Sequence, residues 1–150
     1  MKYRHLIFDF DGVLVESNEI RFNGFRSLFK DYPKNQVNQL IAYAQANGGA
    51  SRYEKIKYFF NEIRKEPVSS DKMDALASQF SQLVKHKVIE APPVAGSIQF
   101  LSDYSTSFDF TLVSGSDQAE LRAICKIRRI HHFFKRILGS PTSKKNNIFK

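Results

Sequence analysis

The chain has 150 residues, 42% of them hydrophobic, which is enough for one domain with a hydrophobic core. No apolar stretch is long enough to span a bilayer, and Asp9 and Asp11 interrupt the only segment near the N-terminus that could act as a signal peptide. These features predict a cytoplasmic protein with no membrane span. The single cysteine, Cys125, excludes an internal disulfide and is expected to be a buried structural thiol.

The positive charge is concentrated at one end of the chain. The formal net charge is +8, yet no acidic residue follows Glu120, and that last segment carries nine Lys and Arg residues. Such a segment could bind RNA. Its basic residues alternate with apolar ones as in amphipathic elements, and it contains no interleaved exposed aromatics and no recognisable binding motif. Nucleic-acid binding is therefore disfavoured.

The first predicted element is a strand at Leu6–Phe8, whose apolar residues are typical of a strand buried on both faces of a parallel sheet. It is followed by Asp9, Phe10, Asp11 and Gly12, and the glycine allows a sharp turn. Helical periodicity then predicts four helices, at about 18–30, about 34–46, from 51 through 63, and around 73–84.

Beyond Pro92 and Pro93 the pattern returns to alternating helix and strand. A short helix is expected near Leu101, a second buried strand at 108–113, a helix capped by Asp117, and a weak third strand at 137–138. Strands that alternate with helices imply right-handed parallel crossovers. The predicted fold class is therefore α/β, a Rossmann-like parallel sheet with an all-helical insertion after its first strand.

Polar residues follow each of the three predicted strands. Asp9 and Asp11 follow the first, Ser114 and Gly115 the second, and the segment that holds Lys144 the third. The carboxyl ends of parallel strands lie together and form the ligand site of open α/β sheets. Two carboxylates, a hydroxyl with backbone amides, and an ammonium group meet the needs of phosphoryl transfer, which requires positioning and charge neutralisation.

These motifs resemble those of the haloacid dehalogenase superfamily of phosphatases and phosphotransferases. Residues 8–13 are similar to the first motif of that family and residues 112–115 to the second. Residues 139–144 are similar to the third-motif region of its phosphoglycolate-phosphatase-like branch, and residues 47–52 to a cap loop of that branch. The resemblance implies an α/β core of residues 1–16 and 89–150 and a helical cap of residues 17–88.

The resemblance also implies the catalytic roles. Asp9 is expected to be the nucleophile that forms an aspartyl-phosphate, and Asp11 the acid that protonates the leaving group and later activates water. Lys144 is expected to hold the phosphate and Asp9 together, with Lys145 as the adjacent alternative. Mg²⁺ is the expected cofactor, bound by the Asp9 carboxylate and by the backbone carbonyl of Asp11, because carboxylate, carbonyl and phosphate oxygens suit this ion.

For substrate binding, the resemblance implies that Ser114 and the Gly115 amide hold the phosphate. Arg52 in the cap is a candidate contact for an anionic group of the substrate, and a solvent-facing or ion-paired arginine is the alternative interpretation. The expected partner is a small phosphorylated metabolite. Neither the substrate nor the oligomeric state follows from the sequence.

The acidic fourth motif of the family has no counterpart in the sequence, since no Asp or Glu follows Glu120. The chain therefore resembles the first two-thirds of such an enzyme, with weakened metal affinity and little turnover expected. The leading hypothesis is a Mg²⁺-dependent phosphomonoesterase in truncated form. The alternatives are a phosphomutase of the same superfamily and a non-catalytic remnant that binds phosphate or RNA.

Overall fold

A three-stranded parallel sheet forms the base of the molecule. The computed structural model describes residues 3–149. The strands are β1 (His5–Phe8), β2 (Asp109–Asp117) and β3 (Phe134–Ser140), in the order β1-β2-β3, with Phe8 opposite Leu112 and Leu112 opposite Ile137. Both pairings are parallel. The expected α/β, Rossmann-like fold class is confirmed.

The prediction that the first strand is buried on both faces is wrong. Ile7 is 46% exposed, and His5 is also exposed. β1 lies at the edge of the described sheet, and the face that carries Leu6 and Phe8 packs against the hydrophobic core. Phe8 contacts Phe110 edge-on, with ring centroids 5.1 Å apart. Because His5 and Ile7 on the other face are exposed, this strand is only half buried.

β2 and β3 are both longer than the sequence indicates. β2 continues through the small polar residues 114–116 to Asp117, which pairs with Ser140 beyond a bulge. The side-chain amide of Gln118 donates to the Ile137 carbonyl at 2.6 Å and accepts from the Gly139 amide at 2.7 Å. The Gln118 side chain thereby makes the two hydrogen bonds with β3 that the backbone of a paired strand would make. The pairing of β2 with β3 thus continues to the end of β3.

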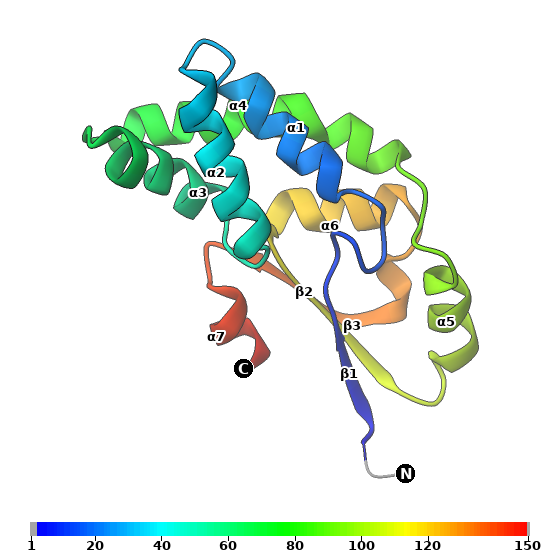
Figure 1. Cartoon of the computed structure of the whole chain (residues 1–150). Helices are drawn as coiled ribbons and strands as arrows, with labels where there is room; N and C mark the ends of the chain where they lie inside the picture. The colour runs from blue at the N-terminus through cyan, green and yellow to red at the C-terminus, as the bar shows by residue number, and fades with distance from the viewer. Residues whose placement is uncertain (1–2, 150) are drawn as a thin grey trace.

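Four helices lie beyond the carboxyl ends of the strands, and we refer to them as the cap helices (Figure 1). The sequence located the first three to within about two residues, whereas the fourth extends at both ends beyond the predicted 73–84. The capping box at Ser51 and Glu54 is confirmed. The domain boundaries at 16/17 and 88/89 stay predictions. The helices are α1 (Asn18–Leu28), α2 (Lys34–Ala46), α3 (Arg52–Tyr58), which continues as a π-helix over Phe59–Arg64, and α4 (Ser70–Glu90).

Three further helices surround the sheet: α5 (Ser97–Tyr104), α6 (Gln118–Ile127) and α7 (Lys144–Ile148). The 3₁₀ turn His131–Phe133 leads into β3. Asp117 caps α6 as expected, because its carboxylate accepts from the amides of Ala119 and Glu120. No helix within residues 3–149 is both long and apolar enough to cross a membrane.

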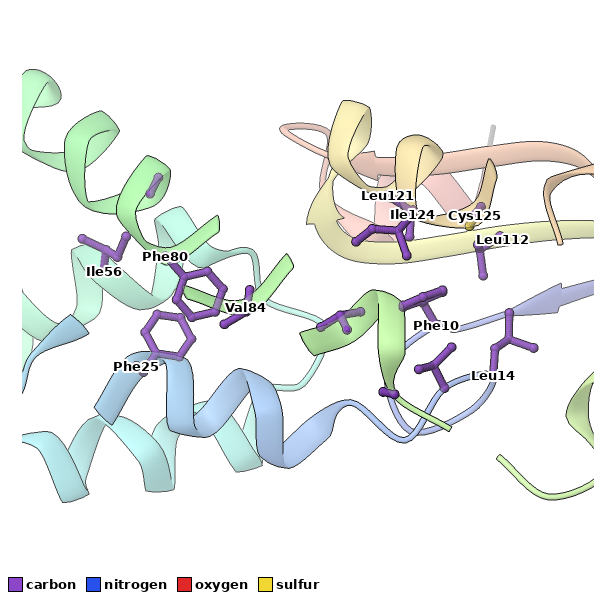
Figure 2. Close-up of a cluster of buried hydrophobic side chains, with 14 of the residues drawn as sticks. Phe10, Leu14, Phe25, Ile56, Phe80, Val84, Leu112, Leu121, Ile124 and Cys125 are labelled. Atoms are coloured by element: carbon purple, nitrogen blue, oxygen red, sulfur yellow. The ribbon is translucent and has the colours of Figure 1, made fainter. Parts of the chain in front are cut away.

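The buried side chains form one hydrophobic cluster that extends from the cap helices to α6 and the sheet (Figure 2). Between the cap helices, Phe25 and Phe80 lie with ring centroids 4.3 Å apart and join α1 to α4. Where α6 packs against the sheet, it contributes Ile124 and Cys125, both fully buried. Burial raises the pKa of the Cys125 thiol to about 12, so this cysteine is the unreactive buried thiol that the sequence predicts.

Two isoleucines on α6 provide a test of this packing. Ile124 is fully buried, whereas Ile127 on the same helix is 56% exposed. Ile124→Ala is expected to lower the free energy of unfolding by about 2–5 kcal/mol because it leaves a cavity. Ile127→Ala is the matched control and should change it by no more than about 0.5 kcal/mol. Urea denaturation measures both, and equal losses would contradict the orientation of α6.

Candidate active site

The turn after β1 separates the two acids of the first motif. The Phe10 amide donates to Asp9 Oδ1 at 2.8 Å, and the Leu14 amide returns to the Phe10 carbonyl at 3.0 Å. Gly12 has a φ of 75°, and a Cβ at this position would lie 2.2 Å from the Asn18 side chain. The turn therefore requires glycine, and it directs Asp11 toward the start of α1.

Asp9, near the start of the chain, contacts Lys144, which lies near its end. Lys144 Nζ lies 2.5 Å from Asp9 Oδ2, and both side chains are partly exposed. Ser143 caps α7 by accepting from the Asn146 amide, which places Lys144 at the first turn of that helix. Of the two lysines that the sequence left open, it is Lys144 that contacts the first-motif acid.

Asp11 lies in a different environment, among donors that the sequence did not single out. Its Oδ1 accepts from Ser17 Oγ at 2.5 Å and from Arg21 Nε at 3.1 Å, and Ser116 Oγ approaches Oδ2 at 3.5 Å. Ser17 and Arg21 are four residues apart at the start of α1, a spacing that puts both on one helix face. That spacing is the signal by which the sequence could have identified them.

The residues of the second motif lie in two environments, one buried in the protein and one at the wall of a cavity. Ser114 is 1% exposed, and its Oγ accepts from the Ser116 amide at 3.1 Å. Gly115 and Ser116 line the cavity described below. A Cβ on Gly115 would lie 2.7 Å from the Gly49 carbonyl oxygen, so the cap loop packs directly on this glycine. The role of Ser114 in phosphate binding stays a prediction.

Two cavities meet at Gly115. The first, of about 60 Å³, lies between the cap helices and the strand ends, and Asp11, Arg21, Arg52 and Lys55 line its polar side. Its apolar side is formed by Phe22, Phe25 and Phe80. The second, of about 300 Å³, lies beside Lys144 and is also lined by Gly115 and by the cap loop.

Arg52 is buried and ion-paired, which was the alternative interpretation of this residue. It is 5% exposed, and its guanidinium donates to Glu120 at 2.8 and 3.2 Å. It also contacts Ser81 Oγ and lines the first cavity. A contact between Arg52 and substrate stays a prediction.

Glu120 is a buried carboxylate next to the candidate site that the sequence did not indicate. Besides Arg52, its carboxylate accepts from Arg21 at 3.3 Å and from Ser81 Oγ at 2.5 Å. Burial by itself would raise the pKa of the Glu120 carboxyl, but these hydrogen bonds and the two guanidinium charges lower it to about 2. Asp11 and Glu120 in turn raise the pKa of Arg21, although burial opposes them.

Asp9 and Asp11 form the oxygen-rich part of the site. Among residues 3–149, no three His, Cys, Asp or Glu side chains gather closely enough to form a metal cluster. Mg²⁺ is nevertheless bound in many proteins by one or two carboxylates together with substrate phosphate and water. The partly exposed carboxylate of Asp9, together with the backbone carbonyl of Asp11, fits that kind of site.

This arrangement agrees with the comparison of sequences. Residues 6–147 match the family model described as haloacid dehalogenase-like hydrolase. The chain belongs to this family. The range matched to the haloacid dehalogenase-like hydrolases spans the positions of Asp9, Asp11, Ser114 and Lys144. No curated protein matches the sequence.

Solved structures of haloacid dehalogenase-like proteins share the fold. A hydrolase of this family from Streptococcus pneumoniae has a TM-score of 0.62 at 23% identity, over 95% of this chain and 64% of its own. YfnB from Bacillus subtilis, described as a HAD hydrolase bound to magnesium, has 0.67 at 18%, over 99% and 74%. A predicted phosphoglycolate phosphatase from Haemophilus somnus has 0.66 at 15%, over 95% and 64%.

The pH dependence of stability tests the Glu120 interactions. Glu120→Gln removes the carboxylate from two guanidinium groups and is expected to cost about 3–5 kcal/mol of unfolding free energy at neutral pH. The pKa of Glu120 falls from 4.5 to about 2 on folding, so its stabilisation is complete above pH 4.5 and is lost as the pH approaches 2. The difference in unfolding free energy between the wild type and Glu120→Gln should therefore decrease as the pH is lowered from 4.5 to about 2.

Urea unfolding at a series of pH values measures this difference in unfolding free energy. Glu62→Gln is the control, because Glu62 pairs with Lys65 on the surface, its side chain is 58% exposed, and its loss should have little effect at any pH. A gap for Glu120→Gln that stays constant between pH 4.5 and 2 would contradict the assigned interactions.

Proposed function

We propose that the chain carries the nucleophile, acid and cap of a Mg²⁺-dependent phosphomonoesterase that acts through an aspartyl-phosphate. The observation that carries this proposal is the contact of 2.5 Å between Lys144 Nζ and Asp9 Oδ2, which joins residues 135 positions apart. Asp11 is held separately, by Ser17 and Arg21. Two neighbouring carboxylates with different cationic partners suit a nucleophile and an acid.

The proposed reaction has two steps. An oxygen of Asp9 attacks phosphorus, the bond to the leaving oxygen breaks, and Asp11 supplies the proton to that oxygen. Asp11 then removes a proton from water, which attacks the aspartyl-phosphate and releases inorganic phosphate and free Asp9. The side chain of Asp9 is 33% exposed and that of Asp11 21%, so both are accessible to a small ligand.

The remaining groups stabilise charge. Lys144 offsets the negative charge of Asp9 and the phosphoryl oxygens, and the Gly115 amide and Ser114 hold those oxygens. The Asp9 carboxylate and the backbone carbonyl of Asp11 would bind Mg²⁺, which supplies further positive charge to the phosphate when bound. The magnesium described for YfnB supports this choice of ion.

The substrate is a small phosphorylated metabolite. The two cavities, of about 60 and 300 Å³, limit the size of the leaving group. A predicted phosphoglycolate phosphatase among the similar structures is consistent with a substrate of this size. The chain spans 64% of that protein, so activity is proposed for the whole enzyme to which these residues contribute. A cytoplasmic location fits such a substrate.

The covalent intermediate depends on Asp9. With a ³²P-labelled small phosphomonoester and Mg²⁺, the wild-type protein should acquire a base-labile phosphoryl label, and Asp9→Asn should acquire none because an amide is a poor nucleophile. Asp31→Asn, at an exposed position, is the matched control and should be labelled normally. Equal labelling of Asp9→Asn and wild type would refute the mechanism. A label transferred to a second position of the substrate, with no phosphate released, would indicate a phosphomutase.

The two adjacent lysines provide a second test. Lys144→Ala removes the ammonium group that contacts Asp9 and should weaken binding of inorganic phosphate about tenfold or more, the effect of losing one charge-assisted hydrogen bond. Lys145→Ala, at an exposed neighbouring position, should change it by less than about twofold. Isothermal calorimetry in Mg²⁺ compares them. A larger loss for Lys145→Ala would assign the role to that lysine instead.

A further inference from the structure

A further cavity, separate from the candidate active site, lies between α6 and β3 at the edge of the sheet. Its volume is about 540 Å³, larger than either cavity of the active site, and none of its lining residues lines those two. Arg122 and Lys126 line it from α6, and Lys135 and Arg136 line it from β3. No Asp or Glu of the described chain lines it. The cavity therefore has positive charge on both walls.

Three of these four cations have no acidic partner within residues 3–149. The fourth, Lys135, pairs with Asp109, with Nζ 2.6 Å from Oδ1. Arg122 Nε donates to a backbone carbonyl oxygen of β3 at 3.4 Å. In the described part of the chain, the side chains of Lys126 and Arg136 form no hydrogen bond and no ion pair. Positive charges that share a cavity repel one another, and an anion bound between them offsets that repulsion.

The remaining wall of the cavity is largely apolar. Phe134 is buried, and Ile137 and Leu138 are partly buried. Apolar walls beside charges of one sign concentrate the electric field in a cleft and raise the local concentration of counter-ions. A volume of about 540 Å³ is also that of many sites for small organic ligands. These properties favour a small anion that carries several negative charges.

The edge of β3 does not suit a peptide that would pair with it as a further strand. The register of β2 with β3 shifts between Phe110 and Thr111, a bulge that leaves Lys135 outside the regular pairing. Bulges and exposed lysines are devices that keep edge strands from pairing with other chains. Strand addition is therefore disfavoured as the use of this surface.

We propose that this cavity binds a small oligophosphate, either free or as the phosphate chain of a nucleotide. Arg122 and Arg136 carry planar guanidinium groups, which bind phosphate oxygens through two hydrogen bonds each. Three or more negative charges match the three cations that lack an acidic partner. Single-stranded RNA fits less well because such ligands stack on exposed aromatic rings, and Phe134 is buried. The inference does not depend on the proposed function, since the cavity shares no lining residue with the active site.

Isothermal calorimetry without Mg²⁺ tests the proposal, with inorganic tripolyphosphate, ATP and orthophosphate as ligands. Tripolyphosphate and ATP should bind the wild-type protein about tenfold or more tightly than orthophosphate, because they make additional charge-assisted hydrogen bonds. If ATP binds more tightly than tripolyphosphate, the base and ribose contribute and the ligand is a nucleotide. Equal affinities identify the phosphate chain alone as the group that is recognised.

Removal of two cations from the cavity should weaken binding. Arg122→Gln combined with Arg136→Gln is expected to lower the affinity for tripolyphosphate about tenfold or more. Lys85→Gln combined with Lys87→Gln is the matched control, because it removes the same net charge from two exposed positions on α4. It should change the affinity by less than about twofold. Thermal unfolding verifies that each variant is folded.

Two measurements locate the ligand. Lys144→Ala, which removes the ammonium group beside Asp9, should bind tripolyphosphate as the wild type does within about twofold, because Lys144 does not line this cavity. In ¹⁵N-labelled protein, tripolyphosphate should shift the backbone amide signals of Arg122, Lys126 and Arg136.

Three results would overturn the proposal. Equal losses in the two double variants, or no advantage of tripolyphosphate over orthophosphate, would mean that the cations act only through the net charge of the protein. A loss in Lys144→Ala that the double arginine variant does not show would place the ligand in the active site. Tighter binding of a short single-stranded RNA than of ATP, lost in the double arginine variant, would assign the surface to nucleic acid instead.

Discussion

The position of the cap helices over the sheet depends on one buried carboxylate. Glu120 lies in the first turn of α6, beside the carboxyl end of β2, and it accepts from Arg21 of α1, Arg52 of α3 and Ser81 of α4. Three cap helices thus converge on one residue at the end of the sheet. Because the ions are desolvated, their mutual attraction is strong and any unpaired member is costly.

The same interactions set the geometry of the acids. Arg21 bonds to Glu120 and to Asp11, so the helix that joins the cap to the sheet also fixes Asp11. Asp9 pairs with Lys144 from the opposite end of the chain. Each acid therefore has its own cation, and the two carboxylates can differ in role although only one residue separates them.

Local patterns predicted much of the fold. The apolar spacing of Val37, Leu40, Ile41 and Ala44 located α2 at 34–46, and the residue pair Ser51 and Glu54 located the start of α3. The polar residues after each strand placed Asp9, Asp11 and Lys144 at one edge of the sheet. These predictions succeed because helix periodicity, capping and strand ends depend on neighbouring residues. The burial of β1 and the length of β2 depend on what packs against them, and there the predictions were wrong.

The sequence by itself determined the family, the fold class and the acid pair, since each depends on a short motif or on a regular spacing. Only the tertiary structure decided which lysine contacts Asp9, and that Arg52 is paired with Glu120, 68 positions away. Ion pairs form between residues that are close in space, whatever their separation in the sequence. The distance between two charged groups in a folded chain is set by the packing of helices on the sheet. It cannot be inferred from the number of residues between them.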